Sequence, residues 1–236
     1  MSHHTKDKGD LAVAKVIAHL LEHDIRVCLP LSEHLPFDFI AVMPDMKTLK
    51  RVQVKYRTMQ GGMVQVNFRS NYYDTKKIYS LRVNLDFLDC YAVYCPDNNE
   101  CYYLRIDEIP ANALAVNLRI LPTRSGQQQG VRYASQFFDP FRMVSNDECS
   151  CTPSARSPRR CNELQRAHLI EQLMMEGFYV CIPHSYHIPF DLVAVTPDMQ
   201  TLHPICIDEH TNWQNFRVDL HINPARMYIS GPVTQR

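Results

Sequence analysis

The apolar residues in the first part of the chain follow two different periods. Near the N-terminus they recur every three or four positions, which predicts a helix over residues 11–23 with Asp10 as its N-cap. Short apolar segments then predict strands at 26–29 and 37–42, and strict alternation predicts a third strand at 49–56. A helix followed by several strands indicates an α/β domain.

The pattern continues with more strands and then becomes irregular. We expect the later elements of this region to be three strands, at 64–68, 90–94 and 101–106, and a helix at 73–81. Residues 123–161 lack a regular period and contain several turn-forming residues. They are predicted to form a linker with a short ordered segment near residues 133–143.

The chain contains an internal sequence repeat. Residues 27–49 and 180–202 align without a gap at an offset of 153 residues, and 15 of the 23 aligned positions are identical. Two copies of one helix–strand unit explain such a match. Only 26 residues follow His210, so we expect the second copy to be truncated and to dock on the first. The predicted parts are a domain at 1–122, the linker at 123–161 and the degenerate copy at 162–236.

Composition narrows the class of protein. The chain has 45% hydrophobic and 21% charged residues, which excludes collagen-like and wholly disordered proteins. The longest apolar segments are too short to span a bilayer, and the polar N-terminus is unlike a signal peptide, so we expect a cytoplasmic protein without a membrane partner. The nine cysteines include no CxxC pair, which favours reduced, buried thiols over a zinc site.

Charge is balanced over the whole chain but uneven along it. The 25 basic and 25 acidic residues cancel, yet residues 47–82 hold nine basic residues and a single acidic one, Asp74. A local positive field of this kind favours a polyanionic partner such as nucleic acid. A solvated, charged face of a domain would give the same pattern.

Three polar residues on neighbouring predicted strands form the candidate site. Gln53 and Lys55 are two positions apart, so they share one face of their strand, and antiparallel pairing would bring Asp38 beside that face. A carboxylate and an amide oxygen can ligate a divalent cation, and a lysine can stabilise developing negative charge. The spacing alone is equally compatible with a turn aspartate and a surface lysine.

The order of these motifs resembles the PD-(D/E)xK nuclease superfamily. The likeness is closest to the group I intron homing endonuclease branch, in which glutamine replaces the acidic residue of the second motif. The segments that carry the resemblance are GDLA at 9–12, PFD at 36–38, QVKYR at 53–57, the tyrosine-rich segment at 72–79 and DCYAVY at 89–94.

The resemblance implies a restriction-endonuclease-like core, with a mixed β-sheet flanked by helices, and a metal-dependent DNA endonuclease. By this likeness Asp38 and Gln53 would ligate Mg²⁺ or Mn²⁺, Lys55 would orient or activate the attacking water, and Tyr56 would lie with Arg57 near the scissile phosphate. It also implies a homo-oligomer of two or four copies. The residues expected to contact DNA are Lys50, Arg51, Arg57, Arg69, Lys76 and Lys77.

Two departures from the family pattern affect this expectation. The family helix usually supplies a glutamate after the GDxA segment, and here that position is Val13, with Asp10 a poorly placed substitute. An alternative function is therefore a catalytically inactive DNA-binding or assembly protein on a nuclease scaffold, and a protein-interaction module without a nucleic-acid role is a third. In the second copy Asp191 matches Asp38, but Cys206 and Asp208 replace Gln53 and Lys55. Catalysis is not expected there.

Overall fold

The computed structural model describes residues 4–74, 77–82, 84–123, 128–144, 163–185, 187–207 and 227–228. The chain divides into two compact units that interleave in sequence: Met1–His23 with Lys50–Ser150, and Asp24–Leu49 with Cys151–Arg236. Both units combine an α-helix with mixed β-structure, so the predicted α/β class with a mixed sheet is confirmed. None of the described helices is long and apolar enough to cross a membrane.

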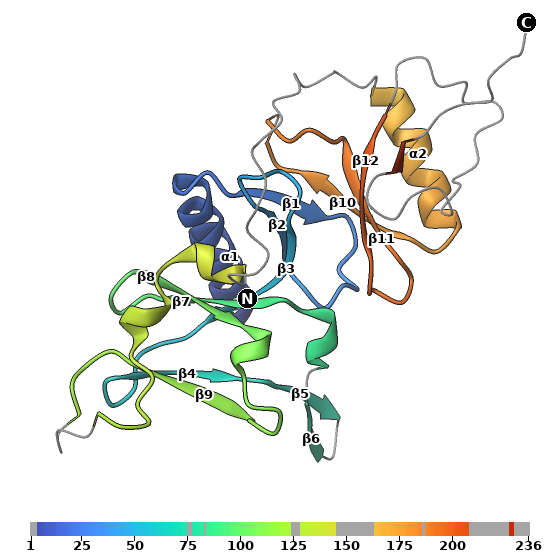
Figure 1. The fold of residues 1–236 in the computed structure, drawn as a ribbon. Helices are drawn as coiled ribbons and strands as arrows, with labels where there is room; N and C mark the ends of the chain where they lie inside the picture. Colours follow the sequence, from blue (N-terminus) through green and yellow to red (C-terminus); the bar gives the residue numbers. More distant parts are fainter. Residues whose placement is uncertain are drawn as a thin grey trace, which may run out of the picture. The chain divides into compact units, whose positions relative to one another are not determined.

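The first unit places one helix against a short mixed sheet. Strand β3 (Leu49–Tyr56) pairs in parallel with β7 (Cys90–Cys95), and β7 pairs antiparallel with β8 (Glu100–Arg105). Helix α1 (His4–Glu22) lies along β7 and β8 (Figure 1). The core of this unit is formed by side chains from all four elements, among them Ala12, Val16, Leu20, Val52, Tyr91, Val93 and Leu104.

The start of α1 differs from the prediction. The helix begins at His4, so Asp10 is an exposed residue within it and not its N-cap. The apolar face of the helix begins only at Leu11, so the spacing of apolar residues does not indicate the polar turns that precede it. Of the residues in those turns, only Lys6 and Lys8 have high helix propensity.

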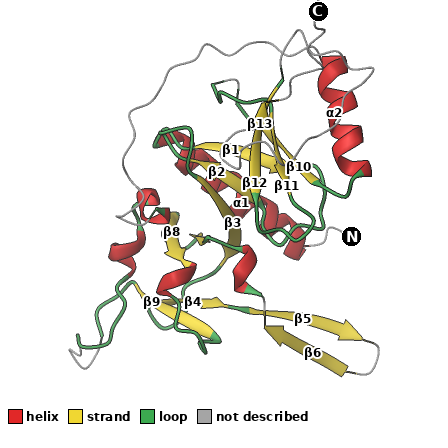
Figure 2. Ribbon diagram, turned by 45° about the vertical axis from the view of Figure 1, so that its right-hand side comes forward, coloured by secondary structure: helices red, strands yellow, loops and turns green. Residues whose placement is uncertain are grey.

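Two antiparallel pairs complete the strands of the first unit. Strand β4 (Met63–Asn67) pairs with β9 (Ala115–Arg119), and β5 (Arg69–Asp74) pairs with β6 (Lys77–Arg82) (Figure 2). The helix predicted at 73–81 is therefore wrong. Tyrosine and isoleucine favour strands, and the ladder sets Tyr72 opposite Tyr79 and Tyr73 opposite Ile78. Short 3-10 helices occur at Leu85–Phe87, Ile106–Glu108, Ala134–Phe137 and Pro140–Met143.

The described part of the second unit contains a row of six strands and one helix. Their order is β13 (Met227–Tyr228), β12 (Leu202–Cys206), β11 (Leu192–Val195), β10 (Tyr179–Pro183), β1 (Arg26–Pro30) and β2 (Phe39–Val42). All neighbours are antiparallel except β12 and β13. Helix α2 (Glu163–Met175) packs on this sheet (Figure 1). Its contact is apolar and includes Leu169, Leu173, Val180, Leu192, Ala194 and Ile205.

Corresponding strands in the second unit have the same length and burial. Strand β10 begins 179 − 26 = 153 residues after β1, and β11 begins 192 − 39 = 153 residues after β2. Strands β1 and β10 share one order of buried and partly buried positions, and β2 and β11 are buried throughout. The sequence identity of these segments is thus matched by the same local structure.

The turns that follow β2 and β11 also have the same backbone. The amide of Met43 donates to the carbonyl of Thr48 over 2.9 Å, and the amide of Thr196 donates to the carbonyl of Thr201 over 3.1 Å. Met46 and Met199 adopt left-handed φ angles of 56° and 60°. In the first turn Asp45 accepts hydrogen bonds from the amides of Lys47 and Thr48 and from the Thr48 hydroxyl. The PDM sequence of each copy therefore shapes a turn.

Candidate active site

Strand β3 carries the two candidate residues of the first unit. Its observed bounds, Leu49–Tyr56, match the predicted strand, so its alternation sets Gln53 and Lys55 on one face. The neighbouring residue on β7 is Tyr91, which is the register partner of Gln53. The Lys55 ammonium lies 5.6 Å from the centroid of the Tyr91 ring. Gln53 and Lys55 are thus brought together as the sequence predicts.

The amide oxygen of Gln53 is one of several buried side-chain polar atoms without a hydrogen-bond partner among the described residues. Gln53 Oε1 is buried and has no hydrogen-bond partner in the described part of the chain. A buried acceptor that lacks a donor costs about 1–3 kcal/mol, so the site favours a ligand that can satisfy it. An amide oxygen is a ligand of hard divalent cations. This atom therefore fits the metal that the resemblance implies.

An aromatic side chain supports this face of the sheet. Tyr91 is fully buried, and its ring lies 5.3 Å from that of Phe68, which is also fully buried. The Lys55 ammonium consequently has a ring on one side in place of water. A cation over an aromatic face gains about 0.5–1 kcal/mol at a partly exposed site. The lysine ammonium thus lies over the ring of the residue that is the register partner of Gln53.

Asp38 belongs to the second unit. It immediately precedes β2 and is partly buried between two buried neighbours, Phe37 and Phe39. Gln53 and Lys55 belong to the first unit. The convergence of all three side chains therefore remains a prediction from the sequence.

The corresponding aspartate of the later segment is held by backbone. Asp191 Oδ2 accepts a hydrogen bond of 2.6 Å from the amide of Ile207, and the Asp191 amide donates to the carbonyl of Ile205. Burial raises the pKa of Asp191, while the hydrogen bond from Ile207 and the charge of Arg166 oppose this rise. An aspartate in this position can thus join two neighbouring strands with one of its carboxylate oxygens.

Arg57 lies just beyond the C-terminal end of β3. Its amide donates to the carbonyl of Tyr94 over 3.0 Å, and its Nη1 donates to the carbonyl of Tyr56 over 3.2 Å. Its Nε is buried without a hydrogen-bond partner among the described residues, and burial lowers the pKa of the guanidinium. A desolvated guanidinium with an unused donor suits an anionic oxygen such as that of a phosphate.

Helix α1 adds a lysine that the sequence analysis missed. Lys8 Nζ lies 5.7 Å from the ring centroid of Tyr56, the residue before Arg57. The same helix face carries Lys15, whose Nζ lies 5.7 Å from the Tyr94 ring and donates to Asn99 Oδ1. The spacing of seven residues, two helical turns, was the signal that could have paired them. Lys15 is engaged within the fold, and Lys8 lies over the ring of Tyr56.

Arg51 is engaged with a carboxylate of the same unit. Its Nε and Nη2 donate to Asp89 Oδ2 and Oδ1 over 2.9 and 3.0 Å, and its amide donates to Oδ2 over 2.7 Å. This pairing ties β3 to the residue that precedes β7. The predicted contact of Arg51 with DNA remains a prediction, and any such contact competes with Asp89 for the guanidinium.

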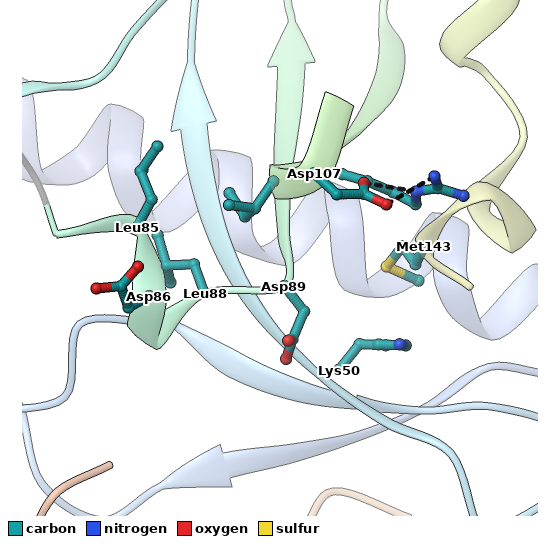
Figure 3. A pocket seen from close by; sticks show the side chains of 9 residues that line it. Lys50, Leu85, Asp86, Leu88, Asp89, Asp107 and Met143 are labelled. Atoms are coloured by element: carbon teal, nitrogen blue, oxygen red, sulfur yellow. Dashed lines mark hydrogen bonds and ion pairs between the residues drawn. The ribbon is translucent and has the colours of Figure 1, made fainter. Parts of the chain in front are cut away.

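Lys50 lines a pocket of about 350 Å³ that contains both acidic and basic side chains (Figure 3). Asp86 and Asp89 come from one side, and Asp107 lies across the pocket in an ion pair with Arg105. The other lining residues are Leu85, Leu88, Ile106 and Met143. Two of the three carboxylates are in ion pairs, Asp89 with Arg51 and Asp107 with Arg105, so the charges of the lining are largely compensated.

The remaining predicted DNA contacts lie on or near the β5–β6 pair. Arg69 is exposed at the start of β5. Lys77 begins β6 opposite Asp74, and Lys76 lies outside the described residues. These three positions remain predictions.

Val13 occupies the position on α1 at which the family has a glutamate. Val13 is a partly buried residue of α1, and the nearby Asp10 is exposed. Within the described residues, no group of three or more His, Cys, Asp or Glu side chains could hold a metal ion.

Comparisons with known proteins identify a family and a similar solved structure. The family described as PD-(D/E)XK endonuclease matches residues 3–140, a range that contains Val13, Asp38, Gln53 and Lys55. Among solved structures, a bacterial homing endonuclease, I-Ssp6803I, is similar to the chain with 20% identity and a TM-score of 0.49. The similarity covers 59% of this chain and 92% of that one. No match is found among curated proteins.

Proposed function

The chain belongs to the PD-(D/E)XK endonuclease family, as its motifs predicted, and we propose that it hydrolyses phosphodiester bonds in DNA in the cytoplasm. The proposed centre consists of Asp38, Gln53 and Lys55 and uses a divalent cation, Mg²⁺ or Mn²⁺. The observation that carries the proposal is the buried Gln53 Oε1, which lacks a partner among the described residues and shares a strand face with Lys55. An oxygen ligand and an ammonium group side by side suit a phosphodiester and a hard cation.

The later segment supports the position proposed for Asp38. There β11 and β12 pair antiparallel, and Asp191 accepts a hydrogen bond from the amide of Ile207. With the offset of 153 residues, these two positions correspond to Asp38 and to Val54, which stands between Gln53 and Lys55. This match in sequence supports the proposal that Asp38 serves the centre together with Gln53 and Lys55.

Each residue has a distinct role in this proposal. Asp38 and Gln53 would hold the cation, which when bound supplies Lewis-acid chemistry to a phosphoryl oxygen and acidifies water. Lys55, held against the Tyr91 ring, orients the attacking water and stabilises the negative charge that develops on the phosphate. The unused Nε of Arg57 can donate to a non-bridging phosphate oxygen. Together they neutralise charge where the pentavalent intermediate forms.

Plasmid cleavage tests this function. Purified protein is incubated with supercoiled DNA in Mg²⁺, in Mn²⁺ and in EDTA, and Asp38→Asn and Lys55→Ala are compared with the wild type. We expect cleavage only with a metal and only by the wild type. Cleavage that persists in both variants would exclude the proposed centre, provided that each variant keeps the melting temperature of the wild type within a few degrees.

One observation favours a second function. Val13 takes the position of the family glutamate on α1, which leaves one carboxylate fewer for the cation. The alternative is a catalytically inactive DNA-binding or assembly protein on a nuclease scaffold. Retention on DNA at low salt, together with an absence of cleavage in both metals, would favour this alternative.

A further inference from the structure

Strands β1 and β10 pair across a local pseudo-twofold axis. Cys28 is opposite Pro183, Leu29 is opposite Ile182 and Pro30 is opposite Cys181. With the offset of 153 residues, Cys181, Ile182 and Pro183 are the counterparts of Cys28, Leu29 and Pro30. The pairing is therefore symmetric: Cys28 faces Pro183, and the counterparts of these two residues, Cys181 and Pro30, also face each other. The axis passes between Leu29 and Ile182.

The hydrogen bonds at the two ends of this pair obey the same symmetry. The amide of Leu31 donates to the carbonyl of Val180 over 2.9 Å, and the amide of His184 donates to the carbonyl of Val27 over 2.8 Å. His184 is the counterpart of Leu31, and Val180 is the counterpart of Val27. The two bonds thus exchange under the pseudo-twofold operation. Such reciprocity is the property of an isologous interface between two identical subunits.

The prolines of both strands fit the pairing. Because hydrogen-bonded and non-hydrogen-bonded pairs alternate in an antiparallel ladder, the two terminal bonds assign Pro30 and Pro183 to non-hydrogen-bonded pairs. A proline lacks the amide hydrogen that a hydrogen-bonded position needs. Each proline therefore lies where its missing donor does not interrupt this ladder, and the same sequence serves both sides of the axis.

The later segment forms one half of this symmetric pair, and it lacks the counterparts of Gln53 and Lys55. Cys206, the counterpart of Gln53, donates its thiol to the carbonyl of Pro189 over 3.1 Å. Asp191 accepts a backbone hydrogen bond and is held where burial raises its pKa. In the sequence, the counterpart of Lys55 is the acidic Asp208. At the sequence position that corresponds to Lys55, this half therefore has a carboxylate in place of a lysine.

We propose that the chain is an internally fused pseudo-dimer that acts as a single subunit with one catalytic centre and cuts one strand of duplex DNA. Strand β10 covers the edge of β1 that would otherwise be free to pair with the β1 of a second chain. This proposal rests on the proposed endonuclease function, and it replaces the expected homo-oligomer by one chain. One centre hydrolyses one phosphodiester in each binding event, so the product is a nick.

Cleavage of supercoiled plasmid over time separates the outcomes. We expect the supercoiled form to convert to open circles, with linear DNA appearing only after the supercoiled form is consumed. Linear DNA that forms at the rate at which supercoiled DNA is lost would overturn the single-centre proposal while upholding the endonuclease. An absence of cleavage in Mg²⁺ and in Mn²⁺ would refute the endonuclease and this proposal with it.

The same substitution in the two halves provides a matched control. Asp38→Asn should abolish nicking, whereas Asp191→Asn should nick at the wild-type rate, because asparagine keeps an oxygen that can accept from Ile207. Loss of nicking in a folded Asp191→Asn protein would overturn the proposal. Hydrogen exchange gives a second measurement: the amides of Leu31 and His184 should be protected equally at all protein concentrations. Protection that grows with concentration would show pairing between chains and would also overturn it.

Discussion

Replacement of Lys55 by methionine removes the ammonium while keeping a long, flexible side chain on Tyr91. The lost cation–π contact, 5.6 Å from nitrogen to ring centroid, is worth about 0.5–1 kcal/mol. The methionine sulfur recovers about 0.3–1.5 kcal/mol against the same ring. The free energy of unfolding should therefore change by less than about 1 kcal/mol, which corresponds to a melting temperature shift of about 2–4 °C for a chain of this size.

The effect on cleavage should be far larger. A group that stabilises the charge of the transition state contributes about 2.7–4 kcal/mol, so the cleavage rate of Lys55→Met should fall by about 10²–10³-fold. Single-turnover cleavage of an end-labelled duplex with saturating protein measures this rate without a contribution from binding. Thermal unfolding of the same samples measures stability.

Lys15→Met is the control for this substitution. Lys15 lies 5.7 Å from the centroid of the Tyr94 ring, almost the same distance as Lys55 from Tyr91, and also donates to Asn99. The Lys15→Met protein should lose at least as much stability as Lys55→Met, and it should keep the wild-type cleavage rate. A loss of less than about tenfold in Lys55→Met, about 1.4 kcal/mol, would refute the catalytic role. If the cleavage rate fell equally in both variants, the loss would be explained by reduced stability alone.

Three further substitutions test the surroundings of the centre. Gln53→Leu removes a buried acceptor without a partner, so urea denaturation should show unchanged or about 1 kcal/mol higher stability, while cleavage and stabilisation by Mn²⁺ are lost. Arg51→Ala should cost about 2 kcal/mol by the same measurement, because the partly buried Asp89 carboxylate loses its charged donors. Burial raises the pKa of Asp45, but hydrogen bonds from Thr48 and from the amides of Lys47 and Thr48 outweigh it and hold the pKa below its ordinary value. The charged Asp45 therefore stabilises the fold above the ordinary carboxyl pKa, and this stabilisation is lost as the pH falls through the lower pKa of the folded state. The difference in free energy of unfolding between wild type and Asp45→Asn should therefore become smaller in acid.

The sequence predicted those elements whose period is set by burial. Strand β3 follows the alternation of its residues to both ends, and β1, β2, β7 and β8 lie within two residues of the predicted bounds. Gln53 and Lys55 share a face because the period of a strand is two, which requires no knowledge of neighbours. Local pattern was sufficient for this half of the candidate site.

Features that depend on contacts between distant segments could not be predicted from the local sequence pattern. The tyrosine-rich segment at 73–81 contains residues compatible with a helix, and only the ladder between β5 and β6 selects the strands. The bidentate contact of Arg51 with Asp89 joins residues almost 40 positions apart in sequence, and the lack of a partner for Gln53 Oε1 among the described residues depends on what packs around it. The grouping of residues 24–49 with the later segment likewise depends on contacts between distant strands.

The aspartate shared by the two copies has a structural use that is independent of catalysis. Asp191 accepts a backbone hydrogen bond from the neighbouring strand although its copy has lost the counterparts of Gln53 and Lys55. The PFD sequence would therefore persist in an inactive copy, since losing the acceptor would leave the Ile207 amide unpaired. It follows that Asp38 alone is weak evidence for an active centre. The discriminating residues are Gln53 and Lys55, because they are the ones that the second copy replaces, and substitutions there decide between an enzyme and an inert scaffold.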